Sequence, residues 1–296
     1  SKKILENKSN QIFAIDRDFE SYQFAKKLKL HFKNRFHFEN KKFSEIHNLK
    51  LKKNNLKGII FDLGYSTSQI KNPKKGLSFL SQGELNMKMG FNDFSASEVV
   101  NILDYGDLTK IFSAFGEEKK SKAISKKIVE LRKNKKINTQ DLVKIIDNIK
   151  KNQFTKIHKS TKVFQALRIF VNKEIHELIY GLINGYKVLP LGGMIVVVTF
   201  HSLEDKIVKY FFKNYSENKN SSRYLPNHPK NKILFKFPKK KPILPDVNEI
   251  KKNPPSRSAK LRYAIKIKED SDFSDFKKKF EYFLNLENLS KKLWKK

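Results

Sequence analysis

The heptapeptide GIIFDLG at residues 58–64 decides the fold class. Its apolar residues follow one another without alternation, which is typical of a strand that is covered on both faces of a parallel sheet. The Val-rich run at residues 194–200 has the same character, and residues 11–16 and 35–38 predict two further short strands. Because helical patterns lie between these runs, the sequence predicts an α/β fold rather than an all-β fold.

A helical segment separates two parts of this α/β pattern. From about residue 95 to 150, apolar residues recur every three or four positions, and Ser95 with Glu98 has the spacing of a capping box. The α/β pattern then resumes at one long predicted helix, whose apolar face runs from Phe164 to Leu182. We therefore predict a first part of the α/β domain at residues 1–74, an inserted helical domain at 75–160 and a second part at 161–296.

The charge of the chain favours a polyanionic partner. The 63 Lys and Arg residues outnumber the 30 Asp and Glu residues and give a net charge of +33. An AT-rich coding sequence, which favours lysine codons, would produce part of this excess. The segment 218–245 contains no acidic residue, and Tyr224, Phe235 and Phe237 stand among its basic residues. This pattern is typical of single-stranded nucleic-acid binding, in which cations contact phosphates and rings stack on bases. The predicted RNA contacts are Lys236, Lys239, Lys240, Arg257 and Ser258.

Several other classes of protein have no support in the composition. The chain has no cysteine, which excludes disulfides and thiolate zinc sites, and we predict no metal site. No apolar run reaches the roughly 18 residues that a membrane span needs, and no signal peptide is visible. We therefore expect a cytoplasmic protein without a membrane partner.

Polar residues follow three of the predicted strands, at the place where open α/β sheets bind their ligands. Asp16 can accept both hydroxyls of a ribose, Asp62 follows the GIIF run, and His201 follows the Val-rich strand. Each residue alone has an ordinary alternative, because an acid or a histidine after a strand is often a turn former or a helix cap, and Ser202 is the natural N-cap here. Three such ends in one sheet together predict a nucleoside site.

The start of the chain differs from a complete nucleoside-binding fold. Such a fold ordinarily has a first strand and a Gly-rich turn before the strand that ends in the ribose acid. Only 15 residues precede Asp16, and none of them is a glycine. We therefore expect the chain to lack its first strand and its Gly-rich loop.

Longer motifs resemble those of one known family. The motifs are DLGYSTSQ at residues 62–69, GEE at 116–118, TKVFQALRIFVN at 161–172, FHSLEDKIVK at 200–209 and RSAKLR at 257–262. They are similar to motifs of the ribosomal RNA small subunit methyltransferase H family, and the resemblance extends from residue 1 to about 268. It implies a class I, Rossmann-like sheet with an inserted helical domain. Because the Gly-rich loop of the family would lie just before Ser1, the resemblance also implies an N-terminally truncated chain that binds cofactor poorly as it stands. It also implies methyl transfer from S-adenosyl-L-methionine to N4 of a cytidine in the decoding region of 16S rRNA, within the small ribosomal subunit and with no DNA partner.

The resemblance also implies roles for individual residues. By position, the cofactor contacts are Asp16, Phe43, Asp62 and Gln69. The catalytic residue stays unknown: Asp62, a backbone carbonyl beside Phe200 or a water can accept the N4 proton, and His201 can touch the base or a phosphate. Among the departures of the chain from the family, Asn86 and Gly90 replace acids.

Two other functions stay open at this point. A non-catalytic RNA-binding or ribosome-assembly protein with a decayed cofactor site is favoured by Asn86, Gly90 and the missing loop. A nicotinamide-dependent dehydrogenase would also place Asp16 on a ribose, but it requires a Gly-x-Gly-x-x-Gly turn upstream of Ser1.

Overall fold

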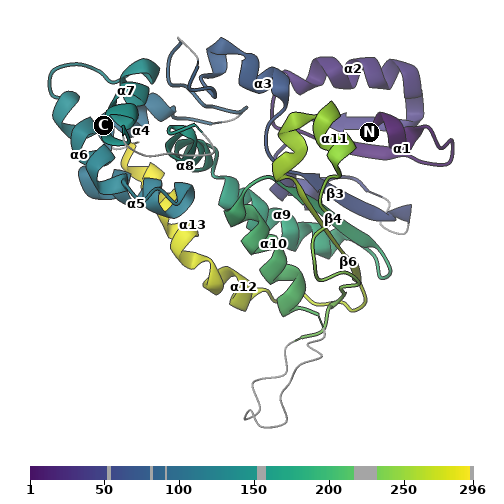
Figure 1. Cartoon of the computed structure of the whole chain (residues 1–296). Helices are drawn as coiled ribbons and strands as arrows, with labels where there is room; N and C mark the ends of the chain where they lie inside the picture. The colour runs from purple at the N-terminus through teal and green to yellow at the C-terminus, as the bar shows by residue number, and fades with distance from the viewer. Residues whose placement is uncertain (52–54, 81–82, 91, 152–157, 217–231, 294–296) are drawn as a thin grey trace, which may run out of the picture. The chain divides into compact units, whose positions relative to one another are not determined.

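The structure is a computed structural model of residues 1–296. It describes all of them except 52–54, 81–82, 91, 152–157, 217–231 and 294–296. The chain forms two compact units that interleave along the sequence, and Figure 1 labels most of their helices and several of their strands. Unit 1 comprises Ser1–Phe43, Tyr65–His176 and Tyr282–Lys296, and unit 2 comprises Ser44–Gly64 and Glu177–Glu281. The mixture of helices and parallel strands confirms the predicted α/β class, whereas the three predicted segments remain a prediction.

Unit 1 begins with a small βαβ arrangement. Its elements are α1 (Lys2–Leu5), β1 (Ile12–Ile15), α2 (Ser21–Phe32) and β2 (Phe36–Glu39), and the two strands are parallel. Leu5, Ala25 and Phe36 form its buried core. We expected β1 to be buried, but Phe13 is 44% exposed. The reason is that Ile12 and Ala14 point into this core, whereas Phe13 lies on the opposite face and stacks on His37.

The other main elements of unit 1 are helices, and those between residues 96 and 149 agree with the helical pattern of the sequence. Its longer helices are α3 (Thr67–Lys71), α4 (Ala96–Ile102), α5 (Tyr105–Gly116), α6 (Ser121–Leu131), α7 (Thr139–Ile149) and α8 (Thr161–Asn172). The predicted capping box of Ser95 and Glu98 starts α4. The C-terminal helix α13 (Glu281–Glu287) brings Phe283 to within 6.1 Å of the Phe115 ring on α5.

Unit 2 is built on a four-stranded sheet. The strands are β3 (Gly58–Asp62), β4 (Met194–Thr199), β5 (Phe235–Lys236) and β6 (Lys260–Lys266), in the order β3-β4-β6-β5. β3 and β4 are parallel, and β6 is antiparallel to both β4 and β5. The accompanying helices are α9 (Glu174–Val188), α10 (Ser202–Asn214), α11 (Val247–Lys252) and α12 (Ser274–Lys279). Across the described helices, none is both long and apolar enough to cross a membrane.

Two details of the predicted sheet are wrong. We expected the three polar strand ends in one sheet, but the described strands form two sheets, because no described strand pairs with the second edge of β1 or of β3. We also expected β3 to be covered on both faces. Ile59 and Phe61 are buried, and Gly185 of α9 lies against them, but Ile60 on the other face is 56% exposed.

The long helix predicted through residues 164–182 is in fact two helices. Lys173 ends α8 with a φ of 48°, in the left-handed region that breaks a helix. α9 then starts afresh, and its first N–H groups are satisfied from elsewhere in the chain: Ile175 and His176 each donate to the Glu287 carboxylate at 2.9 Å. The apolar period continues across the break, so the pattern alone could not reveal it.

Candidate functional site

The predicted ribose acid, Asp16, lies directly after β1 and is partly buried. Its Oδ1 accepts a hydrogen bond from the Asp18 backbone N–H at 2.8 Å, and its Oδ2 accepts one from the Ser21 hydroxyl at 2.7 Å. Asp16 therefore forms the local turn that sequence analysis offered as the alternative role. A carboxylate oxygen has a second lone pair, so both oxygens can still accept hydrogen bonds from a ligand.

Asp18 and Lys75 form a buried ion pair beside Asp16. Asp18 is only 2% exposed, and the Lys75 ammonium lies 2.9 and 2.8 Å from its two oxygens. Burial by itself would raise the pKa of Asp18, but the bonds from Lys75 and Gln69 hold that pKa below its usual value. Sequence analysis missed both members of this pair, although Asp18 follows Asp16 by two positions.

Gln69, another predicted cofactor contact, is buried and connects Asp18 to the start of α3. Its Nε2 donates to Asp18, and its Oε1 accepts from the Ser66 N–H at 2.9 Å in a capping box that starts α3. Asp18 thus connects Asp16 with Gln69 within unit 1. Phe43, the third predicted contact, starts a 3-10 turn and is partly buried.

A polar network fixes the loop that carries the two family departures. Arg17 donates to the Met89 carbonyl at 3.2 Å and to the Asn172 carbonyl at 2.9 Å. The Asn172 side chain is buried and donates to the Met87 carbonyl at 2.9 Å. Residues 87–89 are therefore held to the end of β1 and to the end of α8 by side-chain bonds to their backbone.

Gly90 has a conformational reason to be a glycine. Its φ is +61°, and a Cβ at this position would lie 1.9 Å from the Arg17 carbonyl oxygen. The acid that the resemblance leads one to expect there has no room in this arrangement. The other departure, Asn86, is also used structurally, because its side chain accepts from the Lys88 N–H and donates to the Lys74 carbonyl, both at 3.3 Å.

We predict that Gly90→Ala lowers the free energy of unfolding by more than about 2 kcal/mol, because left-handed strain of about 1–2 kcal/mol adds to a backbone clash. Urea denaturation measures the loss. Gly192→Ala is the matched control: its φ is +79°, but a Cβ there meets nothing within 4 Å, so it incurs the strain alone. Equal losses in the two variants would contradict the clash.

Tyr65, Arg168 and Glu174 form a second polar cluster in unit 1. The Tyr65 hydroxyl donates to Glu174 at 2.5 Å, and the Arg168 guanidinium lies 4.4 Å from the centre of the Tyr65 ring and 3.1 Å from Glu174. Burial and the nearby Glu174 carboxylate raise the pKa of Tyr65 well above its usual value, so the phenol stays protonated. The cluster fixes the position of the Arg168 guanidinium.

In unit 2, two strand ends meet at one edge of the sheet, as the sequence predicts for parallel strands. Asp62 ends β3 in register with Val198 of β4, and the Leu63 N–H donates to the Val198 carbonyl at 3.1 Å. Gly64, with a φ of +92°, lies against the Phe200 ring, which a Cβ would approach to 3.1 Å. This edge therefore brings Asp62 and the Phe200 segment together.

Asp62 is exposed, and no described residue donates a hydrogen bond to its carboxylate. The protein around it raises its pKa above the usual value by desolvation. A carboxylate with a raised pKa and free lone pairs is suited to accept a proton from a ligand.

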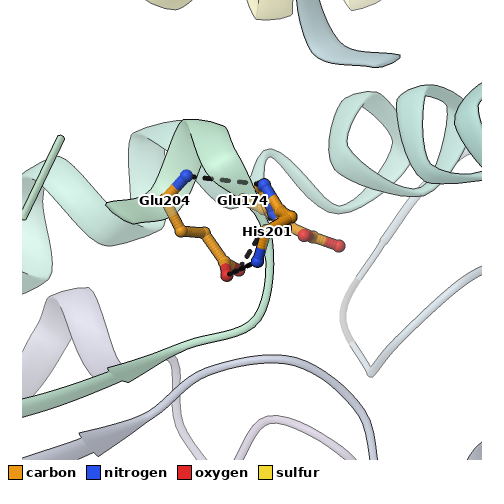
Figure 2. A group of neighbouring side chains, drawn as sticks. All are labelled: Glu174, His201 and Glu204. Carbon is orange, nitrogen blue, oxygen red and sulfur yellow. Dashed lines mark hydrogen bonds and ion pairs between the residues drawn. The ribbon is translucent and has the colours of Figure 1, made fainter. Parts of the chain in front are cut away.

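His201 caps α10, and Figure 2 shows its side chain facing Glu204. Its Nδ1 accepts from the Glu204 N–H at 3.4 Å, and its Nε2 lies 3.1 Å from Glu204 Oε1. In return, Glu204 Oε2 accepts from the Phe200 N–H at 2.8 Å. We expected Ser202 to be the N-cap, but the helix begins one residue earlier because His201 closes the capping box. The cap therefore engages Nδ1 of His201, whereas the buried Nε2 has no hydrogen-bond partner among the described residues.

The predicted RNA contacts are exposed where the structure describes them. Lys236, Lys239 and Lys240, and also Arg257 and Ser258, have solvent-accessible side chains. Residues 217–231, which include Tyr224 and half of the acid-free segment, lie outside the described residues.

Phe235 does not have the stacking role that the sequence suggested. It is only 1% exposed and packs edge-on against Phe211, Phe212 and Tyr186, each at 5.4 Å. Phe237 is partly buried and lies 5.7 Å from the Phe212 ring. The expectation that Phe235 stacks on bases is therefore wrong, because a β-strand places it in the aromatic core of unit 2.

Comparisons with known proteins agree with these motifs. A model of the MraW methylase family matches residues 1–267. Proteins named ribosomal RNA small subunit methyltransferase H are similar to this chain. The one from Afipia carboxidovorans is 37% identical over 93% of this chain and 84% of its own length. The one from Chelativorans sp. is 38% identical over 90% and 78%, and the one from Ehrlichia chaffeensis is 40% identical over 90% and 89%.

Proposed function

The chain belongs to the MraW methylase family, and we propose that it is an rRNA methyltransferase that modifies N4 of a cytidine in the decoding region of 16S rRNA. The observation that carries the proposal is the match over nine-tenths of the chain to proteins named for methylation of small-subunit rRNA. We further propose that the substrate is the small ribosomal subunit and that the protein works in the cytoplasm.

The proposed cofactor is S-adenosyl-L-methionine, which supplies a methyl group on a positively charged sulfur. The residues at the end of β1 in unit 1 provide hydrogen-bond acceptors that fit the ribose hydroxyls of this cofactor. Asp16 presents a partly buried carboxylate at a strand end, and among the described residues its Oδ2 accepts a hydrogen bond from the Ser21 hydroxyl alone. We propose that Asp16 binds the ribose hydroxyls, with Gln69, Phe43 and Asp62 as the other contacts. Asp18 and Lys75 then act as positioning residues for Asp16 and Gln69.

We propose Asp62 as the acceptor of the N4 proton. The exocyclic amine of cytosine is a poor nucleophile because its lone pair is conjugated with the ring, so an acceptor for its N–H helps it to attack. Asp62 has an exposed carboxylate with a raised pKa at the sheet edge beside Phe200, and no described residue donates a hydrogen bond to it. His201 is less suited, since its Nδ1 caps α10 and its Nε2 is buried 3.1 Å from the Glu204 carboxylate.

The rival view of a decayed cofactor site loses much of its support in the structure. Gly90 and Asn86, the departures that favoured it, have local backbone roles. Membership of a methylase family also favours S-adenosylmethionine over the nicotinamide cofactor of the dehydrogenase hypothesis.

A labelling experiment tests the proposal. The full-length protein is incubated with small ribosomal subunits that lack the modification and with cofactor carrying a radiolabelled methyl group. We expect label in 16S rRNA and none in 23S rRNA, and we expect Asp62→Asn to lower the rate at least 100-fold, as loss of a general base does. Subunit binding without any label would establish the rival, a non-catalytic binding protein.

A further inference from the structure

Unit 2 contains a groove of about 570 Å³ that runs along α10. Ser202 and Asn214, which lie at the two ends of α10, both line it, and the start of β6 and the end of α12 complete its walls. Ser202 follows Phe200 by two positions, so one end of the groove lies next to the strand end where we place the acceptor chemistry. None of the predicted RNA contacts lines this groove.

Lysines from three elements converge on the groove. Lys206, Lys209 and Lys213 stand three and four residues apart on α10, which puts them on one face over about 10 Å. Lys260 of β6 and Lys279 of α12 point to the same space. The opposite face of α10 is buried through its apolar residues, so the lysine face has a fixed direction.

The charge of these lysines is not cancelled within the groove. Asp205 is the only acid in its lining, and its two oxygens already accept from Arg262 at 2.7 and 3.2 Å, with Lys260 at 3.3 Å. Asp275 of α12 adds one further negative charge near Tyr210. Within the part of the chain that the structure describes, neither the three α10 lysines nor Lys279 forms an ion pair.

Some exposed lysines elsewhere in the chain lie beside acids that balance their charge. Lys232 lies 3.2 Å from Asp270 and 3.1 Å from Asp272, and Lys135 lies 2.6 Å from Asp141. Those charges are neutralised by neighbouring carboxylates, whereas the groove gathers five lysines around a single, already paired acid.

Tyr210, which lines the groove, indicates that the groove suits the phosphates of a nucleic acid rather than its bases. The Tyr210 ring lies nearly parallel to the Phe276 ring, at 13° and 6.2 Å, and the Phe280 ring meets it edge-on at 5.4 Å. A ring that is packed in this way has little free face for a base. Burial and Asp275 raise the pKa of Tyr210, so its hydroxyl stays a proton donor at neutral pH. Ammonium groups and a phenol are donors for phosphate oxygens.

We infer that this groove binds the phosphate backbone of the RNA that the enzyme modifies, and that it guides the strand toward the sheet edge at Asp62 and Phe200. The identity of the RNA rests on the proposed function, whereas the phosphate chemistry rests on the groove itself. Five lysines on a concave surface give a sequence-independent contact that fixes the position of the strand without reading its bases.

The test compares two triple variants of the full-length protein by filter binding to a 16S rRNA transcript at several KCl concentrations. The groove variant is Lys206→Gln, Lys209→Gln, Lys213→Gln. The control is Lys119→Gln, Lys122→Gln, Lys126→Gln, which removes the same charge at the same spacing from exposed positions of unit 1. For the groove variant we expect the slope of log K against log salt to fall by about 2–3, since each phosphate contact contributes about 0.7–0.9. The control keeps the wild-type slope.

The other outcomes each decide the matter. A groove variant with the wild-type slope, or a wild-type protein that does not bind the transcript, overturns the inference. So does a variant that binds whole subunits weakly but naked rRNA normally, because that assigns the groove to an acidic protein surface. A lowered slope together with no methyl transfer by the wild-type protein keeps the phosphate groove and overturns the proposed function. Thermal melting checks folding, and Lys209→Gln alone, expected to lower the slope by about 0.7–0.9, serves if the triple variant unfolds.

Discussion

Replacing Asp16 by alanine in the full-length protein is expected to weaken the binding of S-adenosylmethionine at least 100-fold. Hydrogen bonds to a charged group contribute about 1.5–3 kcal/mol each, and two ribose hydroxyls lose their acceptor together. Because 1.4 kcal/mol corresponds to a factor of ten in affinity, even the lower figure for two bonds gives about 100-fold. Isothermal titration calorimetry measures the affinity directly.

Two controls separate the ligand from the fold in this experiment. Asp16 also accepts from the Asp18 N–H and from the Ser21 hydroxyl, so a part of any loss could come from the turn. Ser21→Ala removes one of these local bonds and keeps the carboxylate, and we expect its affinity to stay within a few-fold of the wild type. Unchanged affinity of Asp16→Ala would remove Asp16 from the cofactor site.

The second large effect concerns stability. We expect Asp205→Ala to lower the free energy of unfolding by about 3–5 kcal/mol, because removing one partner of a buried pair leaves a buried charge without compensation. The Arg262 side chain is 3% exposed and donates to both Asp205 oxygens. The matched control is Glu130→Ala, which breaks the exposed Lys127–Glu130 pair at 3.2 Å and is expected to lose less than about 1 kcal/mol. Equal losses in both variants would contradict the importance of burial.

The same pair predicts a pH dependence. Burial favours a higher pKa of Asp205, but Arg262 and Lys260 hold the pKa below its usual value. A depressed carboxyl pKa stabilises the folded state above the unfolded-state pKa of about 4, and this contribution is lost as the pH falls through the folded-state value. The difference in unfolding free energy between wild type and Asp205→Ala should therefore be constant near neutral pH and shrink below about pH 4. A difference that grows in acid would contradict the assignment.

Much of the fold could be predicted because it depends on local patterns. The strands at residues 58–62 and 194–199 follow from uninterrupted apolar runs, and the cap at Ser95 follows from a spacing of three residues. The break at Lys173 could not be predicted, because it depends on Glu287, more than 100 residues away, which satisfies the first N–H groups of α9. The exposed faces of β1 and β3 could not be predicted either, since an apolar residue does not tell whether another layer covers it.

The candidate site shows the same limit. Asp16 and Asp62 could be proposed because strand ends are visible in the sequence. Lys75 was missed because its partner, Asp18, is 57 positions away, and no short motif connects them. Phe235 was misjudged because an aromatic residue among lysines gives the same sequence pattern in a nucleic-acid-binding segment and in a short edge strand. The α10 lysine face was missed because Lys260 and Lys279 join it only through the tertiary fold.

The most direct test of the central claim is the identity of the methylated nucleoside. Small subunits treated with the full-length protein and methyl-labelled cofactor are digested to nucleosides and separated by liquid chromatography with mass detection. The account predicts that the new label lies in N4-methylcytidine, at one position in the decoding region of 16S rRNA. Label on carbon 5 of cytosine, on another base, or on no nucleoside at all would contradict it.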